Sequence, residues 1–420
     1  MTVAIGSMLS SPHKFFALAF CMSFSVFYPT PLSAQTSARG ATIPRATLIQ
    51  IIRAEDERRW NAVLSDLLSH KNPAIRARAA LAAGRIGNES AVPPLIWTLQ
   101  NDHDPGVTIL TLLALGEIES PEAIEALTAE LSQGKPSQSR ARAVEALGKI
   151  AAALPPTAEA QKKEIGKTIL ETLKLEAGKR SSADREVILM ALTAALRARP
   201  EGAGAVVAQF LVHSEPRIRA DAGNTLARLR AKDGNEELRK LLTRDADPNV
   251  RANAARVLGA TEDKSAFDGL LNRALNDPDS RVRVSAIRAL GALKDRRAVS
   301  SLMLNVLKIT RETGSAAGKA HVNELLEIVT TLGRLAQNSN DENLFRLVQG
   351  LRGPTRQAPE VEIAQARISP ARYLADSAAD TPGRVAFQTA ILMDWRFASS
   401  LAQGLGEIAS LPDSLTDKAK

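Results

Sequence analysis

The sequence predicts an all-α protein built as one α-solenoid. Two observations predict this fold class. The phrase that begins at Asp247 returns at Asp279, and Gly84, Gly116 and Gly148 follow one another at the same interval. In addition, only 4% of the 420 residues are aromatic, as expected where many helices pack closely through small side chains. A period between about 20 and 50 residues is typical of stacked supersecondary units that bury their apolar faces only against one another.

The repeated phrase describes the second helix of a helical hairpin. An N-cap residue opens it, a proline often follows, and an amphipathic run ends near a small residue. The N-caps in five of seven copies are Asn72, Asp104, Glu215, Asp247 and Asp279. An arginine follows at a fixed place in five copies, namely Arg76, Arg140, Arg219, Arg251 and Arg283, with Thr108 and Val187 in the other two. First helices are expected at 91–99, 121–131, 236–242, 265–275 and 298–307.

The copies fall into two series that are out of step. The first ends at Gly148 and the second begins at Ala195, and the gap between them is longer than one repeat. This excess predicts an insertion loop near 154–162. A second loop is expected at 310–318, because the interval from Gly291 to Gly333 also exceeds one repeat.

These phrases, most clearly between Glu215 and Leu293, resemble HEAT-like repeats of the short variety first recognised in phycobilisome lyases. The resemblance extends over roughly Lys71 to Leu335. It implies an α-solenoid, wound as a right-handed superhelix, and it specifies function only weakly.

Two further segments, 53–60 and 115–120, look like parts of the N-terminal array of exported bacterial proteins that continue into a cyclophilin-type prolyl isomerase. The Phe-His-Arg segment and the strand pattern of that catalytic domain are not in this sequence. The alternative is therefore a substrate- or partner-binding array of a peptidyl-prolyl isomerase, without its catalytic domain.

Residues 1–34 have the pattern of a secretory signal peptide. Lys14 is their only charged side chain, an apolar run extends from Phe15 to Tyr28, and small residues precede Gln35. The run is shorter than the roughly 20 residues that span a bilayer. We expect export to the periplasm or the medium, no membrane span after cleavage, and a mature chain without cysteine.

The expected domain plan has four parts after the signal peptide. Residues 35–60 form a linker and a capping helix, 46–59, whose Leu48, Ile49 and Ile52 cover the first repeat. The repeat array occupies 61–337. Degenerate repeats and C-terminal capping helices follow at 338–410, with the array resuming within 384–408, and a polar tail ends the chain at 411–420. About ten hairpins are expected in all.

No catalytic set, cofactor motif or metal site is predicted. The segment Asn101–Asp104 is interpreted as a turn in which Asp104 is the N-cap, rather than as a metal cluster. The tryptophans Trp60, Trp97 and Trp395 are interpreted as packing residues. The repeated arginines are expected to pair with the acid four residues earlier or with the turn of the neighbouring repeat, and the alternative is an anion-binding face.

The predicted function is that of an exported, non-enzymatic scaffold that binds a protein partner on its concave face. Second helices are expected to line that face and to present Arg142, Glu145, Arg256 and Arg288, a mixture suited to a moderately acidic partner. The net charge is +8, but the arginines recur at repeat spacing, so the excess is interpreted as structural and nucleic acid is not expected.

Overall fold

A computed structural model describes residues 42–378, apart from 133, 180–181, 314–318, 354 and 356–357. Within these residues the chain is helical and contains no strand. The predicted signal peptide, the predicted repeat within 384–408, Trp395 and the polar tail lie outside the described residues. In the part described, no helix has the length and apolar character that crossing a membrane would require.

The helices form two layers. The second helix of each hairpin belongs to the inner layer: α4 (Pro73–Ile86), α6 (Pro105–Ile118), α8 (Ser137–Ala153), α10 (Arg185–Ala198), α12 (Pro216–Leu229), α14 (Pro248–Ala260), α16 (Ser280–Leu293), α18 (Lys319–Leu335) and α20 (Pro359–Ile368). The first helices form the outer layer: α3 (Ala62–Leu67), α5 (Val92–Asn101), α7 (Ile124–Ala129), α9 (Glu159–Gly178), α11 (Ala203–Ala208), α13 (Asn235–Arg244), α15 (Phe267–Asn276), α17 (Ala298–Thr313) and α19 (Glu342–Gly350).

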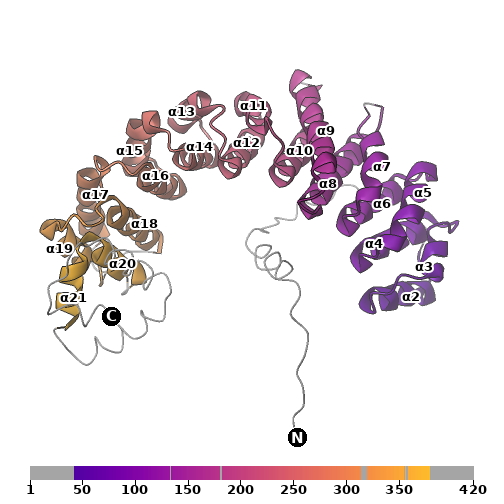
Figure 1. Cartoon of the computed structure of the whole chain (residues 1–420), viewed down its shortest axis with the longest axis horizontal. Coiled ribbons are helices and arrows are strands. Elements are labelled where there is room, and N and C mark those ends of the chain that lie inside the picture. The colour runs from indigo at the N-terminus through magenta and orange to yellow at the C-terminus, as the bar shows by residue number, and fades with distance from the viewer. Residues whose placement is uncertain are drawn as a thin grey trace, which may run out of the picture.

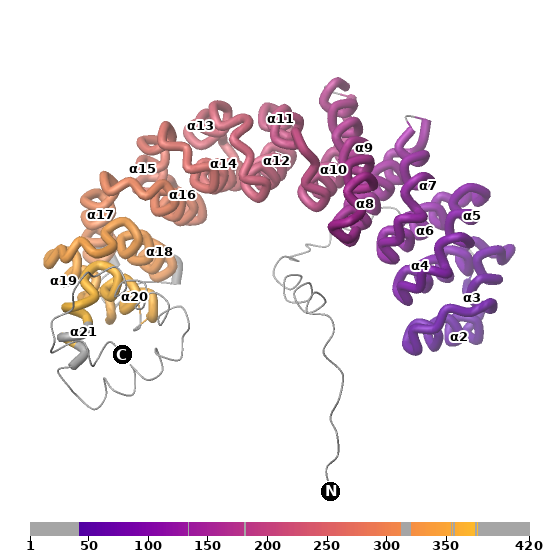
Figure 2. Tube along the Cα trace, viewed as in Figure 1, coloured from indigo at the N-terminus to yellow at the C-terminus, as the bar shows by residue number. Residues whose placement is uncertain are grey.

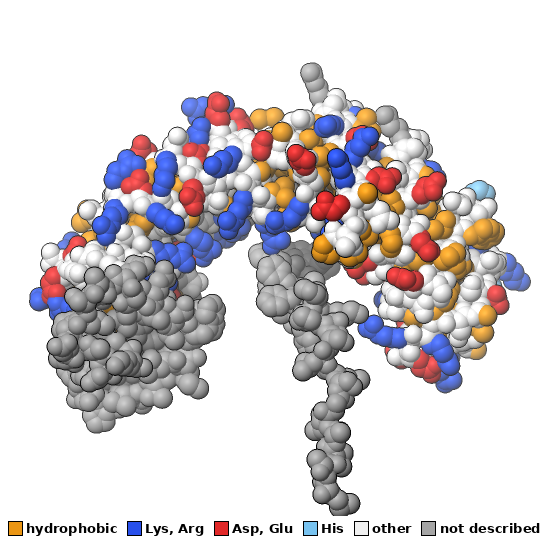
Figure 3. All heavy atoms as spheres, viewed as in Figure 1, with side chains coloured by type: hydrophobic (Ala, Val, Ile, Leu, Met, Phe, Trp, Pro, Cys, Tyr) orange, Lys and Arg blue, Asp and Glu red, His pale blue; other side chains and the backbone are white. Residues whose placement is uncertain are grey.

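The hairpins stack into an open arc, with α2 (Arg45–Asp56) at one end and α21 (Pro370–Ala378) at the other (Figures 1 and 2). Each inner helix packs against the next inner helix along the arc. Basic and acidic side chains are interspersed over the visible face between α9 and α17 (Figure 3). The predicted α-solenoid is therefore confirmed.

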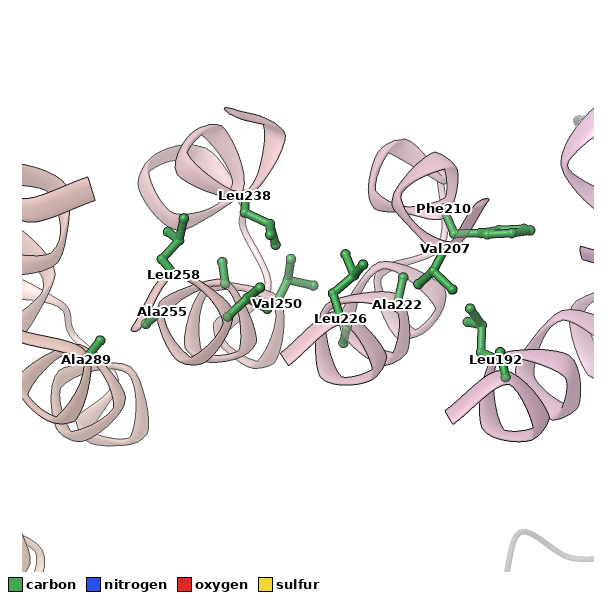
Figure 4. Packing of buried hydrophobic residues seen from close by; sticks show 14 of the residues in the cluster. Leu192, Val207, Phe210, Ala222, Leu226, Leu238, Val250, Ala255, Leu258 and Ala289 are labelled. Atoms are coloured by element: carbon green, nitrogen blue, oxygen red, sulfur yellow. The ribbon is translucent and has the colours of Figure 1, made fainter. Parts of the chain in front are cut away.

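The core is a continuous layer between the inner and outer helices. In Figure 4, Val207 points from the outer layer toward the inner layer, where Leu192 and Leu226 lie, and the Phe210 ring extends sideways above Leu192. All four side chains are buried. Because each hairpin packs against its neighbours, this core continues from unit to unit. A second, small cluster lies at the end that carries α2 and contains Ile51, Ala54, Leu64, Ala82 and Ile86.

Helix starts follow the predicted phrase. The side chain of Asn72 accepts a hydrogen bond from the Ala74 amide at 2.9 Å, and Asp104, Asp247 and Asp279 cap their helices in the same way. These bonds satisfy amides that the helix itself leaves unpaired. Glu215 occupies the N-cap position but makes no side-chain cap bond.

The register of α10 differs from the prediction by one residue. Asp184 is its N-cap and accepts from the amides of Glu186 and Val187. Counted from this cap, Ile188 occupies the arginine position and Leu196 the small-residue position, instead of Val187 and Ala195. A constant repeat period misplaced them, because the N-caps Asp184 and Glu215 are one residue closer in sequence than Asp247 and Asp279.

The predicted insertion loop near 154–162 is wrong in its second half. The additional residues lengthen helices, since α8 has 17 residues and α9 has 20. Ile165, Ile169 and Leu173 form a buried stripe on α9, and this stripe explains why the insertion is helical. Around the second expected loop, residues 310–313 belong to α17, and 314–318 lie outside the described part.

The capping helix α2 forms close to its predicted position but buries a different face. Ile51 and Ala54 are buried, whereas Ile49 is 47% exposed and Ile52 is 40% exposed. Helix α2 packs against α4 through the side that carries Ile51 and Ala54, and Leu48 is half-buried. Ile49 borders an open depression that also includes Val63 and Leu64 of α3.

Candidate protein-binding surface

The repeated arginines join neighbouring repeats. Arg251 of α14 donates from Nε and Nη2 to both carboxylate oxygens of Asp277, each at 2.8 Å. Its Nη1 donates to the carbonyl oxygens of Asp245 and Ala246, each at 3.0 Å. One guanidinium thus connects the turn before its own helix with the turn of the next repeat. This is the bidentate geometry for which arginine is suited.

The same arrangement recurs along the array. Arg76 pairs with Asp102 and Arg219 with Asp245, and each Nη1 also donates to the carbonyl oxygen of a turn histidine, His70 or His213, at 2.8 Å. In these copies, as for Arg251, the acid lies 26 residues after the arginine. We call these residues, with Arg140 and Arg283, the turn arginines.

The insertions change the partner. Arg283 keeps the bidentate arrangement, whereas Arg140 makes one hydrogen bond to its acid and its Nε has no hydrogen-bond partner in the described part of the chain. Arg140 pairs with Glu176 near the end of the long helix α9, and Arg283 pairs with Glu324 of α18 at 2.9 and 2.7 Å. The carboxylate of Glu176 also accepts from the amide of Asp184, the N-cap of the next inner helix, at 2.8 Å. Where the connection is longer, an acid from a helix therefore still lies beside the turn arginine.

Of the two pairings considered from the sequence, the one with the neighbouring turn is correct and the one with the acid four residues earlier is wrong. Asp247 does not pair with Arg251, because its carboxylate caps α14 by accepting from Asn249 and Val250. The acids that do pair were missed as partners. Their sequence signal is an aspartate that stands two positions before an N-cap and 26 residues after an arginine, as Asp277 does.

One turn that follows a repeat without such an arginine has a histidine nitrogen in the acid's place. His213 follows the α10 repeat, in which Ile188 occupies the arginine position, and its Nδ1 accepts from the Glu215 amide at 3.1 Å. Asp277 makes the equivalent bond with the Asp279 amide at 3.0 Å. In this turn no guanidinium has to be neutralised, and the histidine nitrogen accepts the amide hydrogen bond without an acid.

The carboxylates of Asp277 and Asp102 remain ionised despite their burial. Burial alone would raise the pKa of Asp277, but hydrogen bonds from Arg251 and from the Asp279 amide lower it below its ordinary value. Burial would likewise raise the pKa of Asp102, but hydrogen bonds, mainly from Arg76, lower it below its ordinary value. Arg251 is only 7% exposed and Arg140 only 5%. These two guanidinium groups therefore hold the array together and are not free for a partner.

The predicted partner-binding residues Arg142 and Glu145 lie together on α8. Arg142 donates a hydrogen bond to Glu145 at 2.7 Å. The Lys149 ammonium lies 3.5 Å from the carboxylate of Glu145 and 2.7 Å from that of Glu117 on α6. Burial would raise the pKa of Glu145, but the hydrogen bond from Arg142 and the charge of Lys149 lower it. This part of the inner face is internally neutralised.

The other predicted residues, Arg256 and Arg288, are close to each other on α14 and α16. Desolvation lowers the pKa of Arg256, and the nearby charge of Arg288 lowers it further. Arg256 donates to the amide oxygen of Asn253, at 2.9 Å, whereas Arg288 pairs with Glu327 of α18. The four predicted residues thus form two separate groups, because α10 and α12 lie between them (Figure 1).

Trp97 is not a packing residue as predicted, because its side chain is 56% exposed. On α5 the buried positions include Leu95, Thr98 and Leu99, and Trp97 points away from them. It borders an open depression of about 470 Å³ that also includes Leu68. Trp60, in contrast, packs against the core.

The other polar candidates have structural partners. Asp102 is held by Arg76 and Asp104 caps α6, so the segment Asn101–Asp104 is a turn. Among the residues that the structure describes, no three His, Cys, Asp or Glu side chains are grouped as metal ligands would be.

The comparisons with known proteins agree with this geometry. The HEAT repeats family matches residues 45–151 and 235–308. No curated protein matches the sequence. Among solved structures, the chain is similar to importin beta crystallised in a polyethylene glycol condition, with a TM-score of 0.60 and 14% identity, over 85% of this chain and 55% of that one. The chain is also similar to importin beta crystallised in an ammonium sulfate condition, with a TM-score of 0.58 and 14% identity. That similarity covers 89% of this chain and 52% of that one.

A further similarity is to the CpcE–CpcF complex of phycocyanin lyase from Nostoc sp. PCC7120, with a TM-score of 0.36, 16% identity, and coverage of 71% and 98%. The chain spans about half the length of the importin beta structures, so these likenesses concern the fold alone. Between the two family matches, α9 to α12 continue the same two-layered stack although the family does not match there. The chain is therefore an α-solenoid that contains HEAT repeats.

Proposed function

We propose that this protein is an exported, non-enzymatic scaffold that binds a protein partner on the concave face of its arc. The observation that carries the proposal is the inner layer itself, in which helices from α4 to α20 lie side by side along one curved surface. An extended face of this kind suits a polypeptide better than a small molecule.

The turn arginines support this role. A scaffold must hold its repeats at fixed spacing, and each bidentate pair fixes one turn to the next. Exposed polar side chains of the inner face that belong to no ion pair in the described part of the chain, such as Arg228 and Arg334, are then available for contact. Repeat proteins of other families present concave binding surfaces in the same way.

Site-specific photocrosslinking tests which face binds. A photoreactive residue is placed at Asn224 on inner helix α12 and, as the matched control, at Val212 of the 3-10 helix Gln209–Val212 in the outer layer, which is 69% exposed. We expect the inner probe to crosslink one protein from envelope extracts and the outer probe not to. Equal crosslinking from both positions, or none, contradicts the proposal.

Export rests on the signal-peptide pattern of residues 1–34. We expect the full chain, expressed in a bacterium with an envelope, to be recovered from the periplasm with Gln35 as its first residue. Intact mass spectrometry of that fraction checks the position. Material that retains Met1 in the cytoplasm contradicts export.

Enzymatic activity is tested on the same purified protein. The alternative of a prolyl isomerase array predicts that a partner or a further domain supplies catalysis. We expect no acceleration of prolyl isomerisation by residues 35–420. A measurable acceleration would exclude a purely scaffolding role.

A further inference from the structure

One register of the inner layer carries a row of arginines distinct from the turn arginines. The residue directly after the small-residue position is Arg197 on α10, Arg228 on α12, Arg334 on α18 and Arg367 on α20. On α14 and α16 that position is alanine, and Arg256 and Arg288 stand one helical turn earlier on the same face. Six consecutive inner helices thus each present one guanidinium. We call these six residues the inner arginine row.

The row differs from the turn arginines in exposure and in pairing. Arg197, Arg228, Arg256, Arg288 and Arg334 are exposed, and Arg367 is half-buried. Within the described residues, no carboxylate lies at ion-pair distance from Arg228, Arg256 or Arg334, whereas Arg288 has Glu327. Figure 3 shows basic side chains along the inner edge of the arc beneath α12, α14 and α16.

Neighbouring members of the row also repel each other. Desolvation and the charge of Arg288 lower the pKa of Arg256, and desolvation and the charge of Arg334 lower the pKa of Arg367. In the N-terminal part the same register holds Arg85 on α4, which pairs with Glu55, and then Glu117 on α6 and Lys149 on α8, which neutralise each other. Between α10 and α20, in contrast, the charges of neighbouring arginines in the row lower the pKa of Arg256 and Arg367, and an anionic ligand would relieve that repulsion.

The spacing of the row indicates the form of the ligand. Packed helices lie about 8–10 Å apart. A polyproline II helix has three residues per turn and rises about 3.1 Å per residue, so every third side chain returns to one face after about 9 Å. An acidic residue at every third position would therefore meet one guanidinium per inner helix.

Nucleic acid fits the row less well. Proteins that bind single strands stack the bases on aromatic side chains. The inner helices α10, α12, α14, α16 and α20 contain no Phe, Tyr or Trp. Helix α18 contains none either, in its range Lys319–Leu335.

On these grounds we propose that the inner arginine row binds an extended acidic polypeptide, with one carboxylate for each inner helix from α10 to α20. This inference rests on the proposed function and adds the chemistry of the partner to it. It also explains why Arg228, Arg256 and Arg334 lack carboxylate partners while the turn arginines have them.

The test uses synthetic peptides and the purified chain 35–420. The probe is a peptide of Glu-Pro-Pro units, about 18 residues long, in which Glu recurs on one face of a polyproline II helix. The matched peptide of Gln-Pro-Pro units controls for shape, and a peptide of the same composition with its glutamates in one block controls for charge. We expect measurable binding of the first peptide, weaker binding of the block, and none of the glutamine version. Equal binding of the first peptide and the block would contradict the spacing argument.

Paired variants locate the site. Arg228→Gln with Arg334→Gln removes two members of the row, and Arg244→Gln with Arg311→Gln removes two exposed arginines from outer helices α13 and α17. Both double variants change the net charge equally. We expect the inner variant to bind the Glu-Pro-Pro peptide about tenfold more weakly and the outer variant to bind it unchanged. Equal losses of affinity in the two double variants would show that the row acts only through the net charge of the protein, and this would contradict the proposal.

Two outcomes separate this inference from the proposed function. If the inner photocrosslinking probe captures a protein whose binding is unaffected by the inner double variant, the scaffold role stands and the acidic partner is wrong. If single-stranded DNA of similar length binds more tightly than the Glu-Pro-Pro peptide and loses affinity in the same variant, the ligand is a nucleic acid and the inference is overturned.

A purely structural explanation makes a different prediction. Basic residues near helix C-termini stabilise the helix dipole, and this would explain Arg228 and Arg334 without any ligand. It would not explain Arg256, which lies in the interior of α14. An inner double variant that melts at a lower temperature than the outer one but binds the peptide normally would favour the dipole explanation and contradict the proposal.

Discussion

Arg251 and Asp277 are separated by 26 residues in sequence and joined by two hydrogen bonds of 2.8 Å between adjacent repeats. The aspartate simultaneously accepts from the amide of Asp279, the N-cap of the following inner helix. The start of one helix is thus connected to the arginine of the preceding helix through a single buried carboxylate. Disturbing this pair should affect the interface between repeats rather than one helix alone.

We expect Arg251→Ala to lower the free energy of unfolding by about 3–5 kcal/mol, because it leaves the buried Asp277 carboxylate without its main partner. Urea denaturation followed by far-UV circular dichroism measures the loss. Arg288→Ala is the control, since its side chain is 58% exposed and its pair with Glu327 should contribute at most about 1 kcal/mol. Similar losses in the two variants would contradict a special role for the buried pair.

We expect Arg219→Lys to destabilise the protein by about 2 kcal/mol although it keeps the positive charge. Lysine cannot donate to both oxygens of Asp245 and also reach the carbonyl oxygens of His213 and Ser214, as Arg219 does. Thermal and urea unfolding measure this change, with Arg228→Lys on the same helix as the control. Full stability of Arg219→Lys would show that charge alone is needed.

We expect Gly259→Ala to destabilise the array by about 1–3 kcal/mol, because a Cβ at Gly259 would lie 2.8 Å from the Cα of Ala289 on the next inner helix. Gly269→Ala is the matched control in α15. There a Cβ would be 3.4 Å from the nearest atom, a side-chain carbon of Leu242, and the gain in helix propensity is up to about 1 kcal/mol. Opposite signs of the two changes in urea midpoint are the expected result.

We expect acid to weaken the helix cap at Asp279. The hydrogen bond from Arg281 lowers the pKa of Asp279 from 3.8 to about 2. Because the folded value lies below the unfolded one, the stabilisation is complete above about pH 4 and is lost as the pH falls through about 2. Urea midpoints measured across this range should fall less steeply in Asp279→Asn, which can still cap the helix but does not titrate. The exposed Glu201→Gln controls for the change in net charge.

The sequence predicted much of the local structure because its signals are local. An N-cap, a following proline and an apolar stripe lie within one helix, so the starts of α4, α6, α12, α14 and α16 followed from the residues. Predictions that assumed a constant period were less accurate. The shift of α10 and the helical insertion in α9 depend on how far each connection extends before the chain returns to the stack.

By itself, the sequence determined the fold class, the hairpin unit and the presence of a repeated arginine, since these depend on periodicity and on capping within single units. Only the tertiary structure decided the partners of that arginine, the buried face of α2 and the exposure of Trp97. It also brought Arg256 beside Arg288 and aligned the inner arginine row, with members as far apart in sequence as Arg197 and Arg367. The physical reason is that contacts between stacked units depend on their relative rotation and spacing, which no single repeat encodes.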